Sequence, residues 1–198
     1  AQERFKMSIL PQNKGLKAGA GLWTSLWLTQ DCLLCGAPSD GELLCSACAA
    51  SLPKLPKPGC PQCALPTPIG EICGRCLAKP PHYDATLAAY SYDFPLDKLV
   101  QSFKYGHRLP LGKHFGQQLA TLSEQLTADL VLPLPLHPCR LRERGFNQAL
   151  ELARPIGKAL RIPIDTTSCS RTRNTPAQAK LAWREREDNI RGAFHCAA

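Results

Sequence analysis

Eight of the eleven cysteines in this 198-residue chain are spaced with a regularity that indicates metal ligands. They form four C-x2-C pairs, and the second two pairs repeat the first two at a constant offset of 28 residues: Cys32, Cys35, Cys45 and Cys48, then Cys60, Cys63, Cys73 and Cys76. Two thiolates three residues apart on a tight turn can reach one ion, and a second pair completes a tetrahedron. The spacing therefore predicts two structural zinc ions, each held by four cysteines.

Disulfide bonds and a redox-active C-x-x-C are the alternatives for these cysteines. Secreted cysteine-rich chains pair their thiols with one another, but four C-x2-C pairs are typical of metal sites. A thioredoxin-like C-x-x-C needs a strand-to-helix context, which the Pro- and Gly-rich surroundings do not offer. The reduced thiols that zinc requires favour a cytoplasmic protein. Local pairing of neighbouring cysteines is preferred, and a crossed pairing between the two halves stays open.

The zinc segment is expected to be structural or to bind a partner. It is too short and too poor in apolar residues to build its own core, so the metal must supply folding free energy, on the order of 10 kcal/mol per site. Eight thiolates fill two tetrahedra and leave no open coordination position for catalysis. The three other cysteines fit no ligand spacing and are interpreted as small, half-buried hydrophobic residues: Cys139, Cys169 and Cys196.

A basic stretch supplies a second kind of chemistry. Arg140, Arg142 and Arg144 offer guanidinium forks for phosphate oxygens. Gly145 allows close backbone approach, and the helix expected after it adds N–H groups and a positive dipole end. Residues 140–198 carry twelve Lys and Arg against six Asp and Glu, most of the net charge of +8. This predicts a phosphate or pyrophosphate site, and a solvent-facing basic turn is the alternative.

The elements that position these residues are predicted from the apolar pattern. We expect strands over 85–92 and 130–134, and helices over 96–105, 111–126 and 145–160, the last kinked at Pro155. The helix over 111–126 is expected to bury one face, formed by Phe115, Leu119, Leu122 and Leu126. Alternating strands and helices predict an α/β layer with parallel strands, whose ligands lie beyond the carboxyl ends of the strands. The basic stretch follows the carboxyl end of the strand expected over 130–134.

The chain is expected to divide into three parts. Residues 1–30 form an N-terminal lead with a short helix over 18–28, which is too short to span a bilayer. A signal peptide is the alternative for this run. Residues 31–79 form the double zinc ribbon. Pro80 and Pro81 mark a stiff break, after which residues 80–198 form the α/β domain.

The C-terminal half carries motifs that resemble the ComF/GntX family. Those in the middle of the chain are Lys104-Tyr105-Gly106, Pro133-Leu134-Pro135-Leu136 and Arg144-Gly145-Phe146-Asn147-Gln148-Ala149. A spaced series follows at Arg171, Arg173, Thr175, Gln178, Leu181, Arg184, Asn189 and Gly192-Ala193-Phe194. The family's N-terminal zinc-binding region resembles the cysteine segment in a doubled form. Its members are phosphoribosyltransferase-like proteins linked to competence and to the use of external DNA.

The resemblance implies a type I phosphoribosyltransferase-like core that binds phosphoribosyl pyrophosphate with Mg²⁺. The residues that it implies for pyrophosphate or substrate binding are Arg140, Arg142, Arg144, Gly145, Phe146 and Asn147. Those that it implies for a flexible loop closing over the substrate are Arg171, Arg173, Thr175, Gln178 and Arg184. The resemblance names neither a catalytic residue nor an acceptor base.

One motif of that fold is missing from the sequence. An apolar strand ending in two adjacent acids, followed by a Thr/Gly-rich loop, holds the ribose, the Mg²⁺ and the 5′-phosphate. The only adjacent acids here, Glu187 and Asp188, follow a charged stretch instead. We therefore expect a C-terminally truncated, inactive chain, with Mg²⁺ and phosphoribosyl pyrophosphate expected only in the full-length protein. The alternative function is a non-catalytic zinc-ribbon module that binds single-stranded DNA or a partner of the DNA-uptake machinery.

Overall fold

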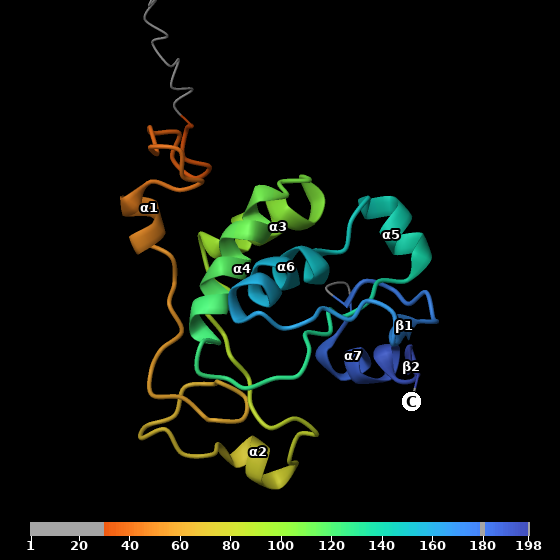
Figure 1. The fold of residues 1–198 in the computed structure, drawn as a ribbon. Coiled ribbons are helices and arrows are strands. Elements are labelled where there is room, and N and C mark those ends of the chain that lie inside the picture. Colours follow the sequence, from red (N-terminus) through yellow and green to blue (C-terminus); the bar gives the residue numbers. More distant parts are fainter. Residues whose placement is uncertain (1–29, 179–180, 198) are drawn as a thin grey trace, which may run out of the picture.

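The computed structural model describes residues 30–178 and 181–197, so the helix expected over 18–28 lies outside the described residues (Figure 1). No helix in this described part is long and apolar enough to cross a membrane. The elements follow one another in the order α1 (Ser46–Ala50), α2 (Gly74–Ala78), α3 (Leu96–Tyr105), α4 (Pro110–Leu122), α5 (Pro138–Arg144), α6 (Gln148–Leu160), β1 (Cys169–Arg171), α7 (Trp183–Ile190) and β2 (Phe194–Cys196).

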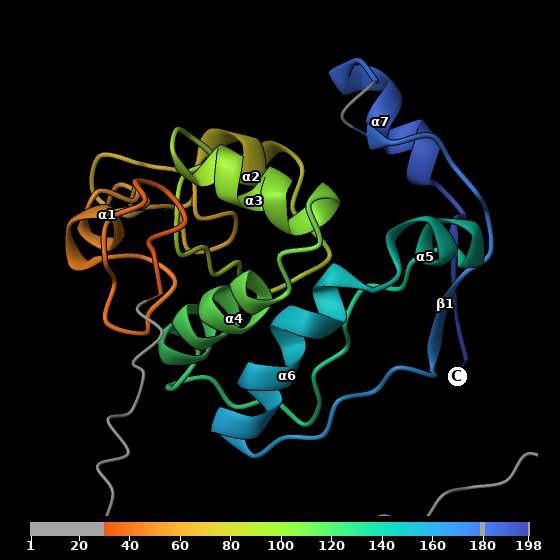
Figure 2. The ribbon, with the colours of Figure 1, turned by 90° about the horizontal axis from the view of Figure 1, so that it is seen from above.

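The helices α3, α4 and α6 occupy the middle of the molecule (Figures 1 and 2). The helices α4 and α6 lie side by side and share the most extensive contact between any two elements of the described chain. Their backbones approach closely at Gly116, where a Cβ atom would lie 2.6 Å from the carbonyl oxygen of Leu152 and 2.8 Å from Cγ of Pro155. Pro155 itself lies inside α6, which continues to Leu160.

The buried core joins the first cysteine group to these helices. It consists of Cys32, Leu44, Leu52, Leu96, Leu99, Phe103, Leu111 and Phe115. Each large apolar side chain removed from water contributes about 1.5–3 kcal/mol. Leu44 and Leu52 come from the first ribbon, whereas Phe103 and Leu111 come from α3 and α4. The core therefore contains residues from both sides of residue 79, the predicted end of the double zinc ribbon.

The helix predictions are right in kind and differ in their bounds. The helix over 96–105 is confirmed as α3. The helix α4 ends at Leu122 rather than at Leu126, and the Ser123 hydroxyl donates a hydrogen bond to the Leu119 carbonyl oxygen at 2.8 Å. The predicted apolar face is also wrong at its end, since Leu122 and Leu126 are 40% and 52% exposed. The helix expected from Gly145 begins at Gln148 as α6.

The predictions of strands over 85–92 and 130–134 are wrong. Both segments are reduced to isolated bridges, one between Lys54 and Tyr90 and one, parallel, between Val131 and Ile164. Prolines at 133 and 135 remove the backbone donors that a strand there would need. The sheet formed by the described residues is the antiparallel pair β1–β2. An α/β layer of parallel strands is thus not formed within the described residues.

Candidate metal centres and a basic pocket

The eight predicted ligand cysteines come together in two groups of four. Within each group all the sulfur atoms lie within 4.8 Å of one another, and the groups are 32/35/45/48 and 60/63/73/76. The Sγ atoms of Cys35 and Cys45 are 3.7 Å apart, and those of Cys63 and Cys73 are 3.6 Å apart. A tetrahedron with Zn–S bonds of about 2.3 Å has edges of about 3.8 Å. Both donor sets therefore fit zinc, and the grouping is local rather than crossed.

The same local structure builds both groups. In the first, a turn lets the Gly36 N–H donate to the carbonyl oxygen of Cys32, and an isolated bridge joins Asp31 to Pro38. The second repeats both features 28 residues later, in the bond from Ala64 to Cys60 and the bridge between residues 59 and 66. The second pair of cysteines in each group lies at the start of a short helix, α1 or α2.

The thiols within a group differ in acidity. Hydrogen bonds from the backbone N–H groups of Cys63 and Cys73 lower the pKa of Cys60 to about 6. Burial, with hydrogen bonds to neighbouring thiols, raises the pKa of Cys76 to about 12. The four thiols of a group can all be ionised only beside a cation. Zinc binding therefore releases protons, and the affinity of each site for zinc falls as the pH is lowered.

The predicted basic loop is wrong as a loop, because Arg140, Arg142 and Arg144 lie on the helix α5. The local sequence favours this helix, since Pro138 occupies its first position and Nδ1 of His137 accepts a hydrogen bond from the Cys139 N–H at 3.2 Å. The helix ends at Gly145, whose φ of 72° is the left-handed conformation that glycine adopts readily.

Each of the three arginines contacts a residue of α5, α6 or α3. Arg140 forms an ion pair with Glu143 at 2.8 Å, and Arg142 donates to the sulfur of Cys139 at 3.4 Å. Arg144 donates to Oε1 of Gln148 at 2.8 Å, and its guanidinium lies 5.4 Å from the centre of the Tyr105 ring. None of the three lines the neighbouring pocket.

That pocket has a volume of about 520 Å³ and lies where α5, α6 and β1 meet. It is lined by Pro133, Pro135, Leu136, Pro138, Leu141, Gly145, Phe146, Asn147, Leu150, Glu151, Arg154, Thr166, Cys169, Ser170 and Arg171. Gly145, Phe146 and Asn147 are predicted substrate-binding residues, and Arg171 is a predicted loop residue. The structure therefore brings residues from both predicted segments to one cavity.

Arg171 lies in a perturbed electrostatic environment. Burial, followed by the positive charges of Arg140 and Arg144, lowers the pKa of its guanidinium. Its Nη2 donates to Oγ1 of Thr175 at 2.5 Å, and its guanidinium lies 5.3 Å from the centre of the Phe194 ring. Its buried Nε has no hydrogen-bond partner among the described residues. An anion in the pocket would relieve the repulsion between the guanidinium groups.

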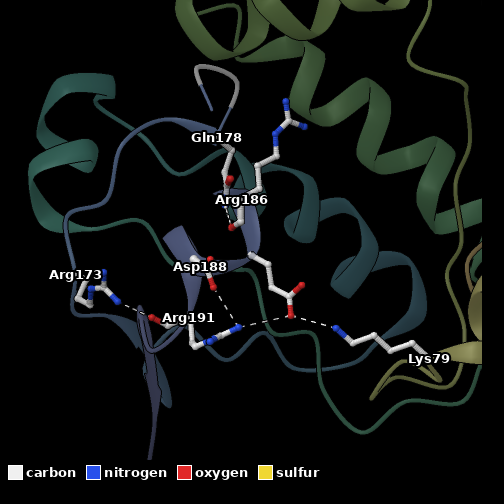
Figure 3. Close-up of polar contacts among 7 residues, drawn as sticks. Lys79, Arg173, Gln178, Arg186, Asp188 and Arg191 are labelled. Atoms are coloured by element: carbon white, nitrogen blue, oxygen red, sulfur yellow. Dashed lines mark hydrogen bonds and ion pairs between the residues drawn. The ribbon is translucent and has the colours of Figure 1, made fainter. Parts of the chain in front are cut away.

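The rest of the predicted flexible loop lies beside α7 (Figure 3). Arg173 donates to the carbonyl oxygen of Arg191 at 2.5 Å, and Gln178 donates to that of Arg186 at 3.2 Å. Thr175 is buried, and Arg184 lies on α7 itself rather than in a loop. Of the five predicted loop residues, only Arg171 lines the pocket.

Sequence reasoning did not assign most of the lining residues to a site, and Arg154 and Cys169 are among those it missed. Periodicity could have found both. Asn147 and Arg154 are seven residues apart, about two helical turns, which places them on one side of α6. Cys169 and Arg171 are two residues apart on β1, so their side chains lie on the same face of the strand.

Comparison with known proteins agrees with these features. Residues 23–77 match the family model described as double zinc ribbon domain. The chain is 34% identical over 173 residues to the DNA utilization protein YhgH of Escherichia coli, which covers 82% of this chain and 76% of the relative. Identity to competence protein F of Haemophilus influenzae is 28% over 162 residues, covering 78% of this chain and 70% of that protein. Identity to competence protein ComFC of Bacillus subtilis is 25% over 132 residues, covering 62% and 55%. No solved structure matches the chain.

Two all-cysteine centres with zinc geometry, built on a repeated turn-and-helix unit, define a double zinc ribbon protein. The ribbon is joined through a shared core to helices that carry a basic pocket. With this arrangement, and with its similarity to YhgH over most of its length, the chain belongs to the ComF family.

Proposed function

We propose that this protein takes part in the uptake or use of external DNA and that its basic pocket binds pyrophosphate or phosphoribosyl pyrophosphate. The names of its relatives, which are DNA utilization and competence proteins, support the first part. The half-buried guanidinium of Arg171, with an unsatisfied Nε and two further arginines in its field, supports the second. Reduced zinc thiols favour a location in the cytoplasm.

In this proposal Arg171 holds the anion inside the pocket. Arg140, Arg142 and Arg144 lie on the adjoining helix and stabilise the negative charge of the pyrophosphate from outside. The Asn147 side chain accepts from the Ala149 N–H and donates to the Leu134 carbonyl oxygen, so it fixes the start of α6 at the pocket wall. Residues 80–198 then correspond to a phosphoribosyltransferase-like domain of the type I class, preceded by the ribbon over 31–79 and the lead over 1–30.

We propose ligand binding rather than group transfer for residues 1–198. The strand with two adjacent acids that would hold ribose and Mg²⁺ does not occur in this sequence. Glu151 is the one carboxylate among the residues that line the pocket, and it pairs with Arg154 at 3.4 Å. The lining residues therefore do not fit Mg²⁺, and we derive no step through this ion.

Titration of the protein with pyrophosphate in a calorimeter tests the ligand. Arg171→Gln should weaken binding by about 10- to 150-fold, which corresponds to the roughly 1.5–3 kcal/mol of a charge-assisted hydrogen bond. Arg75→Gln is the matched control, because it removes the same charge from an exposed position on α2 outside the pocket. Equal losses in both variants, or no loss in either, would contradict the proposed site.

A second function, binding of single-stranded DNA, is favoured by exposed aromatic residues at both ends of α3. Phe94 precedes this helix and is 75% exposed, and Tyr105 ends it and is 62% exposed. The guanidinium of Arg144 lies over the Tyr105 ring. Bases stack on such rings while cations contact the phosphates.

A labelled oligonucleotide of single-stranded DNA tests this alternative. The logarithm of the affinity should fall linearly with the logarithm of the salt concentration, and Tyr105→Ala should weaken binding by about 1–3 kcal/mol. Tyr83→Ala is the control, since Tyr83 is similarly exposed but lies outside α3. Binding that ignores salt, or no binding at all, would remove this function.

A further inference from the structure

Two cysteines outside the zinc centres face each other across the small sheet. In the antiparallel pair β1–β2, Cys169 lies directly opposite Cys196. Their sulfur atoms are 2.8 Å apart, although 26 residues separate them along the chain. Neither belongs to a group of metal-ligating residues in the described chain. The pair is therefore free for a chemistry that the zinc thiols cannot perform.

The backbone places these two residues at a distance suited to a disulfide bond. Hydrogen bonds from Thr172 to Ala193 and from Ala197 to Ser168 flank the pair. In the alternation of an antiparallel ladder, Cys169 and Cys196 then occupy a non-hydrogen-bonded position, where Cα atoms are about 4.5 Å apart. Cα atoms of disulfide-bonded cysteines are roughly 4.4–6.8 Å apart. A bond between the sulfurs therefore needs no rearrangement of the two strands.

The two thiols differ in access to solvent. Cys196 is exposed, whereas Cys169 is buried and lines the basic pocket. A dissolved oxidant therefore meets the sulfur of Cys196 first. The hydrogen bond between the two sulfurs, followed by burial, raises the pKa of Cys169. Because reaction with a peroxide requires the thiolate, burial and the raised pKa both slow the reaction of Cys169.

We propose that Cys169 and Cys196 form a reversible redox pair that closes to a disulfide bond across β1–β2. The Cys196 thiolate attacks a hydroperoxide, displaces the corresponding alcohol or water, and becomes a sulfenic acid. The Cys169 thiol then attacks the sulfenyl sulfur, the S–S bond forms, and one water leaves. Two thiols thus lose two electrons and two protons, and the hydroperoxide is reduced by two electrons. A small dithiol restores both thiols by exchange.

This bond would join the two strands that carry the aromatic–cation contact of the pocket. Arg171 lies two residues after Cys169, and Phe194 lies two residues before Cys196. Both Arg171 and Phe194 are held in register by the same ladder. Oxidation therefore fixes the wall of the pocket in its present form. The inference rests on the geometry of the sheet and on the exposure of the two thiols, and it does not depend on the ligand proposed for the pocket.

Peptide mapping of the 198-residue protein tests the pair. The zinc-loaded protein is treated with a small excess of hydrogen peroxide, alkylated and digested with trypsin without reduction. Cleavage after arginine releases Cys169 in the peptide 162–171 and Cys196 in the peptide 192–198. We expect the two peptides as one disulfide-linked species, lighter by two hydrogens than their sum, which a dithiol separates again. Because the thiols are adjacent, the sulfenic acid of Cys196 should be trapped as the disulfide, and the linked species should appear before zinc is released.

Three serine variants complete the experiment. Cys169→Ser and Cys196→Ser should each abolish the linked species, and Cys196→Ser should also leave Cys169 unoxidised. Cys139→Ser is the matched control, because Cys139 is half-buried on α5 and should leave the linkage unchanged. The proposal is overturned if the wild-type peptides stay reduced while zinc is lost, or if either cysteine pairs with Cys139 instead.

Discussion

At the scale of single residues, the environment of Arg171 comes from parts of the chain that are distant in sequence. Its guanidinium contacts Thr175 and the ring of Phe194, and it feels the charges of Arg140 and Arg144. Sequence motifs placed Arg171 and Arg144 in two separate functional segments. The fold brings them into one electrostatic field, which is why a single substitution at Arg171 is the sharpest test of anion binding.

A prediction at the residue scale concerns the two hydrogen bonds of the Asn147 side chain. Its Oδ1 accepts a hydrogen bond from the Ala149 N–H at 3.0 Å, which caps α6, and its Nδ2 donates to the Leu134 carbonyl oxygen at 3.1 Å. Asn147→Ala removes both bonds and should lower the free energy of unfolding by about 1–2 kcal/mol. Urea denaturation followed by circular dichroism measures the change.

Asn147→Asp separates the two roles of this side chain. Aspartate caps a helix as well as asparagine does, but it cannot donate to the Leu134 carbonyl oxygen. We therefore expect a loss smaller than that of Asn147→Ala. A wild-type stability for the alanine variant would show that the cap contributes nothing to α6.

At the scale of elements, the close approach of α4 and α6 depends on glycines as well as on large apolar residues. Gly112 and Gly116 both lie on the buried face of α4. A Cβ atom at residue 112 would meet Cβ of Glu151 at 2.9 Å, and one at residue 116 would meet the backbone of Leu152 at 2.6 Å. The apolar period along α4 predicts a helix, but it does not show that a second backbone lies against the small residues.

Gly116→Ala tests this contact. Alanine favours a helix over glycine by about 1 kcal/mol, but the backbone oxygen of Leu152 cannot move aside without shifting α6. We expect the steric cost to exceed the helical gain and to lower the free energy of unfolding by roughly 1–3 kcal/mol. Thermal unfolding by calorimetry measures it.

Gly74→Ala is the matched control for that substitution. Gly74 is also helical, in α2, but a Cβ atom there meets nothing within 4 Å. Its stability should be unchanged or slightly higher. A stabilised Gly116→Ala variant would contradict the close approach of α4 and α6.

At the scale of the whole molecule, the two zinc centres have different relations to the rest of the protein. The first shares a buried core with α3 and α4 through Cys32, Leu44 and Leu52. No residue of the second group of cysteines belongs to this core cluster of the described chain. The second ribbon contacts the remainder through weaker links, such as the exposed ion pair of Lys79 with Glu187 at 3.2 Å (Figure 3).

This difference predicts unequal effects of metal loss. Replacing Cys32 and Cys35 by serine should release about one of two zinc ions and also lower the unfolding temperature of the helical core, because Cys32 and Leu44 pack on it. Replacing Cys60 and Cys63 by serine should release one zinc ion with little effect on that core. Elemental analysis and calorimetry measure the two quantities.

Two outcomes would contradict the prediction. Unchanged zinc content in either double variant would show that those cysteines are not ligands. Equal losses of core stability would show that the ribbons do not differ in their packing. Acid should release zinc from both centres in the wild-type protein, because the thiolates must be protonated as the metal leaves.

The local features of this protein were determined by its sequence. The C-x2-C spacing predicted the eight cysteines that come together in two groups of four, because a metal knuckle is built from residues only three apart. The helix over 96–105 followed from its apolar period. Pro138 and Gly145, which the sequence analysis assigned to a loop, mark the start and the end of α5. The strand predictions failed because short apolar runs between prolines do not say whether a neighbouring strand is available.

The tertiary structure alone decided how distant segments meet. It placed Cys169 opposite Cys196 and brought Arg171 to the pocket that Gly145 also lines. These contacts link residues tens of positions apart, and they depend on the packing of α4 against α6 and on the pairing of β1 with β2. No local periodicity encodes such contacts, because they arise only when whole elements bury their surfaces against one another.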